Sequence, residues 1–391
     1  MKKIVSPAAK GRDPVLTELL ARIGRREKII SVRGLEGAGR AFLMALLHRQ
    51  LKRPVLVITP TEKESRQLYR DLVFFAGEEQ IFLYPPWEVV STDLFAWQRE
   101  VELSRSEGLC RLLAGEPMLT VAPVKALLQK APSREVVAAY CRRICLGEFL
   151  DRDELILNLL QGGYHRVTLV EGKGEFAVRG NVLDLYPPPA PCPLRLEFVG
   201  DEIESIRRFD SNSQRSQQEI DEFLLTPARE VIMTEARQAL GIQHAKRRIN
   251  ELELPRALRD RLVERMANGL TMSINPLLLP LFYDDVAPPG FLLDYFSPEG
   301  LLIWDDSPAI ARSGEELTNE IDRLLLKARR EERFYLEREA HYWPADRPAQ
   351  EGENFQQLFL DNLDFGRYPE ALELRAAPPA GIKSGMEIRD R

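Results

Sequence analysis

The stretch GLEGAGRA, residues 34–41, follows a short apolar run, KIISV, and precedes a second one, FLMALL. A strand, a glycine-rich loop and a helix in this order are the setting of a phosphate-binding loop, whose pattern is G-x-x-x-x-G-K-[ST]. Gly34 and Gly39 stand at the spacing that this pattern requires. Arg40, however, occupies the position of the lysine, and Ala41 occupies that of the serine or threonine.

These two replacements weaken the chemistry of such a loop. In a working site the lysine reaches the β- and γ-phosphates, and the hydroxyl that follows it binds Mg²⁺. Ala41 offers no oxygen to a metal, and an arginine is larger and planar, so the exchange at residue 40 is not conservative. The loss of one charge-assisted contact costs about 1.5–3 kcal/mol. The backbone amides from Gly37 to Arg40 can still cradle an anion at the start of a helix.

The composition is that of an ordinary globular chain. Its 391 residues are enough for two or three domains, and the formal net charge of −6 does not indicate a protein built mainly to grip nucleic acid. The sequence contains no apolar run that could span a membrane and no signal peptide, so we expect a cytoplasmic protein that binds no membrane. The four cysteines and four histidines follow no metal-ligand or triad spacing, so no metal ion is expected.

The first 130 residues alternate between strand-like and helix-like patterns. Buried strands are indicated by VLVITP (Val55–Pro60), IFLYP (Ile81–Pro85) and LTVAP (Leu119–Pro123), and EKESRQLYRDLVFF (Glu62–Phe75) indicates a helix with apolar residues at helical spacing. This alternation predicts a parallel sheet with helices on both faces.

A second motif of the nucleotide-binding type lies far along the chain. LLIWDDSP, residues 301–308, predicts another buried strand that ends in Asp305 and Asp306. In working ATPases of this type the second acid is usually glutamate, which polarises the attacking water, and Asp306 is one methylene shorter. The altered loop and the altered acids together predict a nucleotide fold whose site has decayed.

Between these two halves the pattern changes. Five short strand-like runs follow one another from about residue 165 to 209, and Gly180-Asn181 and Gly200-Asp201 are hairpin-type turns between neighbouring runs. The proline-rich YPPPAPCP, residues 186–193, cannot continue a strand and acts as a stiff connector. We therefore predict a small antiparallel β insert.

Helical patterns return after about residue 227, and the charged run from Glu315 to Trp343 predicts one long, solvent-facing helix. From about residue 344 the composition turns rich in proline, glycine and glutamate. Whether the chain is a fragment or a natural short form stays open. The predicted domains are a first half of a degenerate helicase-like α/β domain (1–130), a β-rich insert (131–215), the second half of the α/β domain (216–343) and a linker or truncated start of a further domain (344–391).

The insert carries a signature that resembles a known family. GGYHRVTLVEGKGEFAVRGNVLDLYP, residues 162–187, is followed by LRLEFVGDEIESIRRFD, residues 194–210. The pattern GY-x-R, G-x-F/Y-x-x-RG, D-x-F/Y-P, and R-x-E-F followed by DEI resembles the second domain of the nucleotide excision repair protein UvrB, and more closely that of the transcription-repair coupling factors (Mfd). The matching positions are Gly163, Tyr164, Arg166, Gly174, Phe176, Arg179, Gly180, Asp184, Pro187, Arg195, Glu197, Phe198, Asp201, Glu202 and Ile203.

Two departures separate the chain from UvrB itself. UvrB resembles a helicase with an intact phosphate loop and a tyrosine-rich β-hairpin that inserts into DNA, whereas here the loop is altered and the segment after Trp87 is short. Both points favour the coupling factors, whose N-terminal module is a degenerate copy of UvrB. The resemblance extends over about residues 25–340 and implies a RecA- or helicase-like α/β domain in two halves, interrupted by a β-rich UvrA-interaction domain.

The resemblance also implies a function in protein recruitment. In this family the β insert docks UvrA, which brings the excision machinery to a stalled RNA polymerase. It implies that Arg166, Phe176 and Arg179 contact UvrA, and arginine and aromatic side chains suit such a role. Phe176 can instead face the core of the insert.

The motor of the family is an ATP-dependent DNA translocase. It would supply the ATP–Mg site and the contacts to DNA and RNA polymerase, and it has no counterpart in these 391 residues. For this chain alone we therefore expect neither a cofactor nor catalysis. Two alternatives stay open, a P-loop ATPase or helicase with an unusual loop, and a UvrB-like protein that binds damaged DNA.

Overall fold

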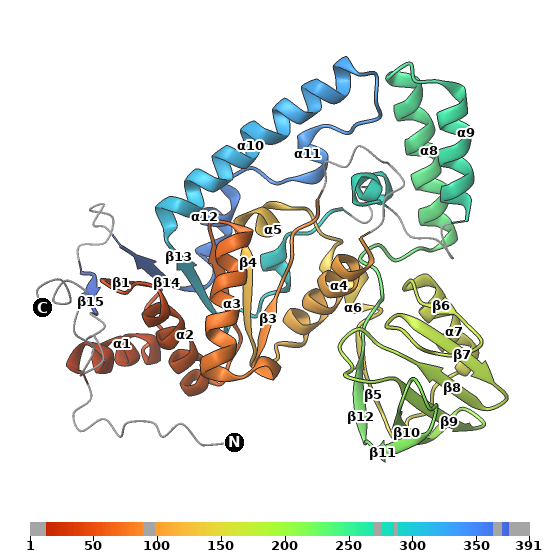
Figure 1. The fold of residues 1–391 in the computed structure, drawn as a ribbon, viewed down its shortest axis with the longest axis horizontal. Helices are drawn as coiled ribbons and strands as arrows, with labels where there is room; N and C mark the ends of the chain where they lie inside the picture. Colours follow the sequence, from red (N-terminus) through yellow and green to blue (C-terminus); the bar gives the residue numbers. More distant parts are fainter. Residues whose placement is uncertain (1–12, 89–97, 269–274, 285–287, 363–369, 375–391) are drawn as a thin grey trace, which may run out of the picture.

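The computed structural model describes residues 13–88, 98–268, 275–284, 288–362 and 370–374 (Figure 1). The short segment after Trp87 lies outside the described residues, and so does most of the region beyond residue 362.

An α/β body is built around a parallel sheet. Within the described residues this sheet has seven strands in the order β15-β1-β14-β13-β2-β4-β3, and every neighbouring pair runs parallel. Strands from before and after the insert therefore lie side by side, which confirms an α/β domain in two halves. The strands are β1 (Ile29–Arg33), β2 (Val55–Thr59), β3 (Ile81–Leu83), β4 (Leu119–Pro123), β13 (Leu301–Asp305), β14 (Gln356–Asp361) and β15 (Leu372–Glu373).

The apolar runs of the central strands serve two cores at once. Leu301 and Ile303 of β13 join the core on one face of the sheet, and Leu302 and Trp304 join the core on the other face. A strand buried on both faces must be apolar at every position, which is why these runs were recognisable in the sequence. The first core is covered by α1 (Pro14–Gly24), α2 (Ala38–Leu51) and α3 (Glu62–Ala76). The second is covered by α4 (Arg99–Ala114), α5 (Val124–Leu128), α8 (Glu235–Glu251), α9 (Arg256–Ala267) and α10 (Ser307–Arg330).

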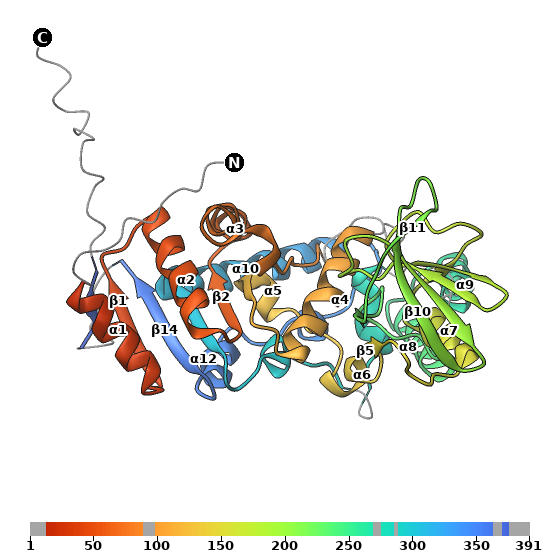
Figure 2. The ribbon, with the colours of Figure 1, turned by 90° about the horizontal axis from the view of Figure 1, so that it is seen from below.

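The insert is a separate β-rich unit at the end of the molecule opposite α1 and β15 (Figures 1 and 2). Its main sheet has the order β11-β10-β9-β8-β7-β6; all its pairs are antiparallel except β6 with β7. The insert has its own apolar core, to which α7 contributes Leu155 and Leu159. Its elements are β5 (Arg142–Cys145), α7 (Arg152–Gln161), β6 (His165–Arg166), β7 (Glu175–Arg179), β8 (Val182–Leu185), β9 (Leu194–Val199), β10 (Glu202–Phe209), β11 (Ser216–Glu219) and β12 (Glu222–Leu225).

Short elements complete the described chain. They are η1 (Glu78–Gln80), α6 (Arg134–Ala138), η2 (Pro276–Phe282), η3 (Leu292–Tyr295), α11 (Arg338–His341) and α12 (Arg347–Gly352). Helices α8 and α9 pack against each other as a hairpin (Figure 1).

The fold class is confirmed, but three predicted boundaries differ from the structure. The long helix begins earlier, at Ser307, and ends at Arg330, where the chain turns at Glu332 with a φ of 48°. The β-rich unit runs past residue 215, because β11 pairs with β10 and β12 pairs with β5. The predicted linker after residue 344 was also wrong in part, because β14 lies within it and is a central strand of the sheet.

Candidate functional site

The loop between β1 and α2 has the local geometry that its sequence predicts. The backbone adopts positive φ angles at Gly34 (83°) and Gly37 (49°), a region that favours glycine, and Gly37 then forms the N-cap of α2. Because only β14 separates β1 from β13, the loop and the end of β13 lie near each other at the carboxyl edge of the sheet, where ligands bind in such folds.

Arg40 is held by three contacts inside the protein. Its Nη1 forms an ion pair with Oδ1 of Asp305 at 2.5 Å, its Nε donates to the carbonyl oxygen of Leu35 at 2.9 Å, and its Nη2 donates to Oδ1 of Asn362 at 2.8 Å. The side chains of Arg40 and Asp305 are only 12% and 13% exposed. The guanidinium therefore joins the loop to the end of β13 and to the residue after β14. The positive charge of Arg40 is therefore paired with the carboxylate of Asp305 in the same chain.

The ionisation of Asp305 depends on this pair. Burial raises the pKa of Asp305 above its ordinary value, and the adjacent Arg40 opposes that rise. Without Arg40, the buried carboxyl of Asp305 would lose its charge at a lower proton concentration, so the arginine favours the charged form of Asp305.

The remaining predicted nucleotide residues also have structural partners. Ala41 is fully buried in the core beneath α2. Asp306 caps α10, where its Oδ1 accepts from the amide of Ala309 at 3.1 Å. The amides of Gly39 and Arg40 donate to backbone carbonyls within the loop, so two donors of the predicted anion cradle are already used.

The predicted partner-binding residues of the insert separate into two kinds. Arg166 on β6 and Arg179 at the end of β7 are exposed. Arg179 donates from Nη2 to the carbonyl oxygen of Thr168 at 3.1 Å, which places it beside the chain that leaves β6. Phe176 is 0% exposed and belongs to the core of the insert, so its prediction as a contact residue was wrong. The alternation of β7 points Phe176 inward.

Other positions of the family signature hold the insert together. Arg195 binds Asp184 through two contacts, Nε to Oδ1 at 2.7 Å and Nη2 to Oδ2 at 2.9 Å, across the β8–β9 pair. Tyr164 is buried and donates its hydroxyl to the carbonyl oxygen of Thr226 at 2.7 Å. A Cβ at Gly163 would lie 2.2 Å from Nε of Arg229, so only glycine fits there. These residues maintain the shape of the insert.

A buried ion pair that the sequence did not reveal joins the insert to the body. Nε of Arg105 on α4 lies 2.9 Å from Oε1 of Glu230, just beyond the last strand of the insert, and the two side chains are 0% and 1% exposed. The indole of Trp87 donates to the same carboxylate, and Gln129 accepts from Nη1 of Arg105 at 3.2 Å. Ser106 adds a hydrogen bond to the carbonyl oxygen of Pro227 at 2.7 Å. The exit of the insert is therefore fixed to α4.

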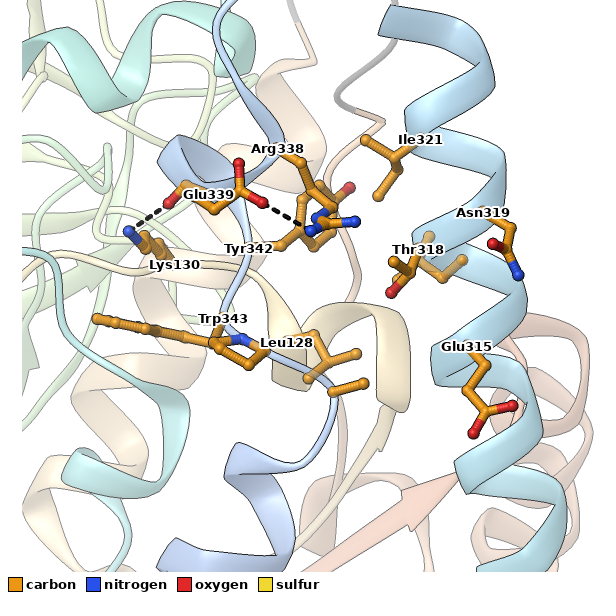
Figure 3. A pocket seen from close by; sticks show the side chains of 13 residues that line it. Leu128, Lys130, Glu315, Thr318, Asn319, Ile321, Arg338, Glu339, Tyr342 and Trp343 are labelled. Carbon is orange, nitrogen blue, oxygen red and sulfur yellow. Dashed lines mark hydrogen bonds and ion pairs between the residues drawn. The ribbon is translucent and has the colours of Figure 1, made fainter.

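The body also contains a groove of about 610 Å³ between α10 and the segment that follows α11 (Figure 3). Leu128, Ile321 and Trp343 give it an apolar lining, and Lys130 lies with its Nζ 4.5 Å from the centre of the Trp343 ring. At its rim Arg338 binds Glu339 and Asp322. None of the residues predicted from the sequence as functional lines this groove.

In the described ranges no three His, Cys, Asp or Glu side chains come together in a way that could hold a metal ion. No helix in the described ranges is both long and apolar enough to cross a membrane.

Comparison with known proteins gives two results that agree. The family model of the UvrB interaction domain matches residues 143–231, from β5 to the segment that carries Glu230. The chain is also similar to proteins named transcription-repair-coupling factor, with 33% identity over 317 residues to that of Myxococcus xanthus, 29% over 307 residues to that of Bacillus subtilis (strain 168) and 29% over 269 residues to that of Escherichia coli (strain K12).

These similarities cover much of the chain but only part of the relatives. They extend over 77%, 76% and 69% of this chain and over 26%, 26% and 23% of those three proteins. The chain thus spans about a quarter of the length of the curated relatives that it matches. The resemblance to the UvrB-like region of the coupling factors, stated above from the signature of the insert, is confirmed.

Proposed function

We propose that this chain, similar to one part of the transcription-repair coupling factors, recruits the excision-repair protein UvrA through its β-rich insert. The observation that carries the proposal is the exposure of Arg166 and Arg179 on the region that matches the UvrB interaction domain. Each exposed guanidinium group can form a bidentate pair with a carboxylate of a partner. The ion pair between Arg105 and Glu230 supports the same role, because it holds the insert in a fixed position on the body.

The α/β body acts in this proposal as a scaffold without nucleotide turnover. Three features support it: the internal ion pair of Arg40, the burial of Ala41 and the use of Asp306 as a helix cap. A phosphate would have to displace Asp305 and Asn362 from Arg40 and would leave a buried carboxylate unpaired, which costs free energy. In the coupling factors, the DNA translocase, its ATP–Mg site and the contacts to DNA and RNA polymerase would then lie outside the quarter of their length that this chain matches.

A binding titration with purified UvrA tests the recruitment role. The double variant Arg166→Glu/Arg179→Glu should weaken binding by about 30-fold or more, since truncated interface arginines of the hot-spot class cost about 2 kcal/mol or more. Arg312→Glu/Arg323→Glu, at two exposed positions of α10, makes the same change of charge in the body and should bind as the unaltered chain does. Unchanged binding of the double variant would contradict the proposed surface.

A further inference from the structure

Exposed apolar side chains gather on the insert. Phe149 is 76% exposed, Val199 59% and Leu146 45%. Five of the nine large apolar side chains that are exposed in the described residues belong to the insert, although the insert is only about a fifth of the chain. Single exposed apolar residues are normal on a protein surface, but exposed apolar residues that lie next to one another mark an interaction site.

Phe149 and Val199 lie on the same face at one end of the main sheet of the insert. Glu202 pairs with Val199 across the β9–β10 hairpin, and on its other side it pairs with Phe149 through a single bridge. Residues directly opposite each other on neighbouring strands point their side chains to the same face. The three side chains therefore form a row in which two exposed apolar groups flank a carboxylate.

This row is continuous with the exposed arginines. Arg152, three residues after Phe149, donates from Nη1 to the carbonyl oxygen of Gly180 at 2.5 Å, directly beside Arg179. Arg179 in turn donates to the carbonyl oxygen of Thr168, two residues beyond Arg166. Direct contacts thus connect the arginine edge of the insert to the end that carries Phe149.

The arginine edge by itself lacks an aromatic group. Interfaces concentrate their binding energy in a few aromatic and arginine residues at the centre, surrounded by contacts that exclude water. Phe176 is inside the core, and Tyr186 is half-buried with its hydroxyl bound to the carbonyl oxygen of Pro191. Phe149 is the one exposed aromatic residue between residues 142 and 225, all of which are described.

The charges around the row define the partner surface that fits it. Glu202 lies within the apolar row, between Phe149 and Val199, and Arg179 lies farther along the sheet on the side of Val199. A complementary surface has an apolar pocket for the phenyl ring, a lysine or arginine beside it that meets Glu202, and carboxylates farther along that meet Arg179.

We propose that Phe149, with Val199 on the other side of Glu202, is the apolar anchor of the UvrA-docking surface, and that this surface runs from Arg166 at the edge of the sheet through Arg179 to Phe149. The inference rests on the proposed function. It adds the residue that enters the partner. Phe149 takes the role of aromatic contact residue, which the buried Phe176 cannot take.

Alanine substitution tests the anchor against a matched control. Phe149→Ala should weaken UvrA binding about tenfold or more. Phe74 on α3 is 73% exposed in the body, so Phe74→Ala removes an equally exposed ring from a face that the proposal leaves uninvolved, and its binding should stay within twofold. Phe149→Leu keeps much of the apolar area and should lose less than the alanine variant does. Val199→Ser tests the neighbouring position and should weaken binding about threefold.

The outcomes separate this inference from the proposed function. If Phe149→Ala binds within twofold of the unaltered chain while Arg166→Glu/Arg179→Glu loses binding, the arginine surface stands and the anchor is overturned. If both bind normally, the proposed function itself fails. A loss in Phe74→Ala as large as that in Phe149→Ala would overturn the anchor, because the effect would not be local. Should Phe149→Ala unfold, normal binding by both Val199→Ser and Phe149→Leu would overturn it.

Discussion

Arg40 in the first turn of α2 and Arg179 at the end of β7 are the same type of side chain in opposite surroundings. Arg40 is nearly buried and bonded to Asp305, to Asn362 and to a backbone carbonyl. Arg179 is exposed, and it donates a hydrogen bond to the carbonyl oxygen of Thr168. The guanidinium of the first arginine binds groups of its own chain, whereas that of the second is exposed to solvent. Burial and neighbours, more than residue type, decide what each can do.

A third arginine extends the buried side of this comparison and should give the largest effect on stability. Arg105→Met leaves Glu230 as an unpaired buried carboxylate, so we expect a loss of about 3–5 kcal/mol in the free energy of unfolding. Urea unfolding measures it. Arg105→Met/Glu230→Gln should recover part of the loss, and Arg111→Met, on the more exposed side of α4, should cost about 1 kcal/mol or less. A loss of less than about 1 kcal/mol in Arg105→Met would show that the ion pair between Arg105 and Glu230 contributes little to stability.

Arg40→Ala should have the second largest effect on stability. The substitution leaves Asp305 without its cation in a position that is only 13% exposed, so we expect a loss of about 1–3 kcal/mol at pH 7. Arg49→Ala on the same helix removes an arginine whose contact is an exposed one to the carbonyl oxygen of Phe75, and it should change stability by less than about 0.5 kcal/mol. Equal losses in the two variants would contradict the special role of Arg40.

The pH dependence sharpens this test. Burial raises the pKa of Asp305 above its ordinary value of 3.8, and removing Arg40 lets it rise further. A carboxyl whose folded-state pKa is raised contributes stability below its unfolded value and loses it as the pH rises through the folded value. The deficit of Arg40→Ala should therefore be smallest near pH 4 and grow toward pH 7. A deficit that shrinks with rising pH would contradict the assignment.

The smallest expected effect is the binding of nucleotide to the loop between β1 and α2. Titration with Mg-ATP should give no binding tighter than about 1 mM, because the cation and two backbone donors of the loop are already engaged. A turnover assay with DNA serves as the second readout. Micromolar binding with DNA-stimulated hydrolysis would instead favour an ATPase or helicase.

Strands that are apolar at every position could be predicted from the sequence. β14 was not predicted, because its first residues are polar and are buried with hydrogen-bond partners. Val55–Thr59 was recognisable because the strand is buried on both faces. β14 begins with Gln356 and Gln357, which are buried with their amides bound to backbone carbonyls and to the indole of Trp304. Such partners come from distant segments, so a polar start in a proline- and glutamate-rich region resembled a linker.

The candidate site was predictable in its positions but not in its roles. The family resemblance pointed to Arg166, Phe176 and Arg179 as contact residues for UvrA, and these lie on the neighbouring strands β6 and β7, yet a single sequence does not say which face of β7 is the core. The partners of Arg40 lie 265 and 322 residues away, so no local pattern could show that its charge is used internally. Phe149 precedes the signature. It was not predicted as a contact residue, because its neighbour Glu202 lies 53 residues away and no local pattern joins the two.

The most direct test of the account compares Arg40→Ala and Arg179→Ala in one UvrA-binding titration with the folded chain. The account predicts that Arg40→Ala binds UvrA as tightly as the unaltered chain, although it is less stable, and that Arg179→Ala binds at least about tenfold more weakly without loss of stability. The reverse pattern, weakened binding by Arg40→Ala and normal binding by Arg179→Ala, would contradict it.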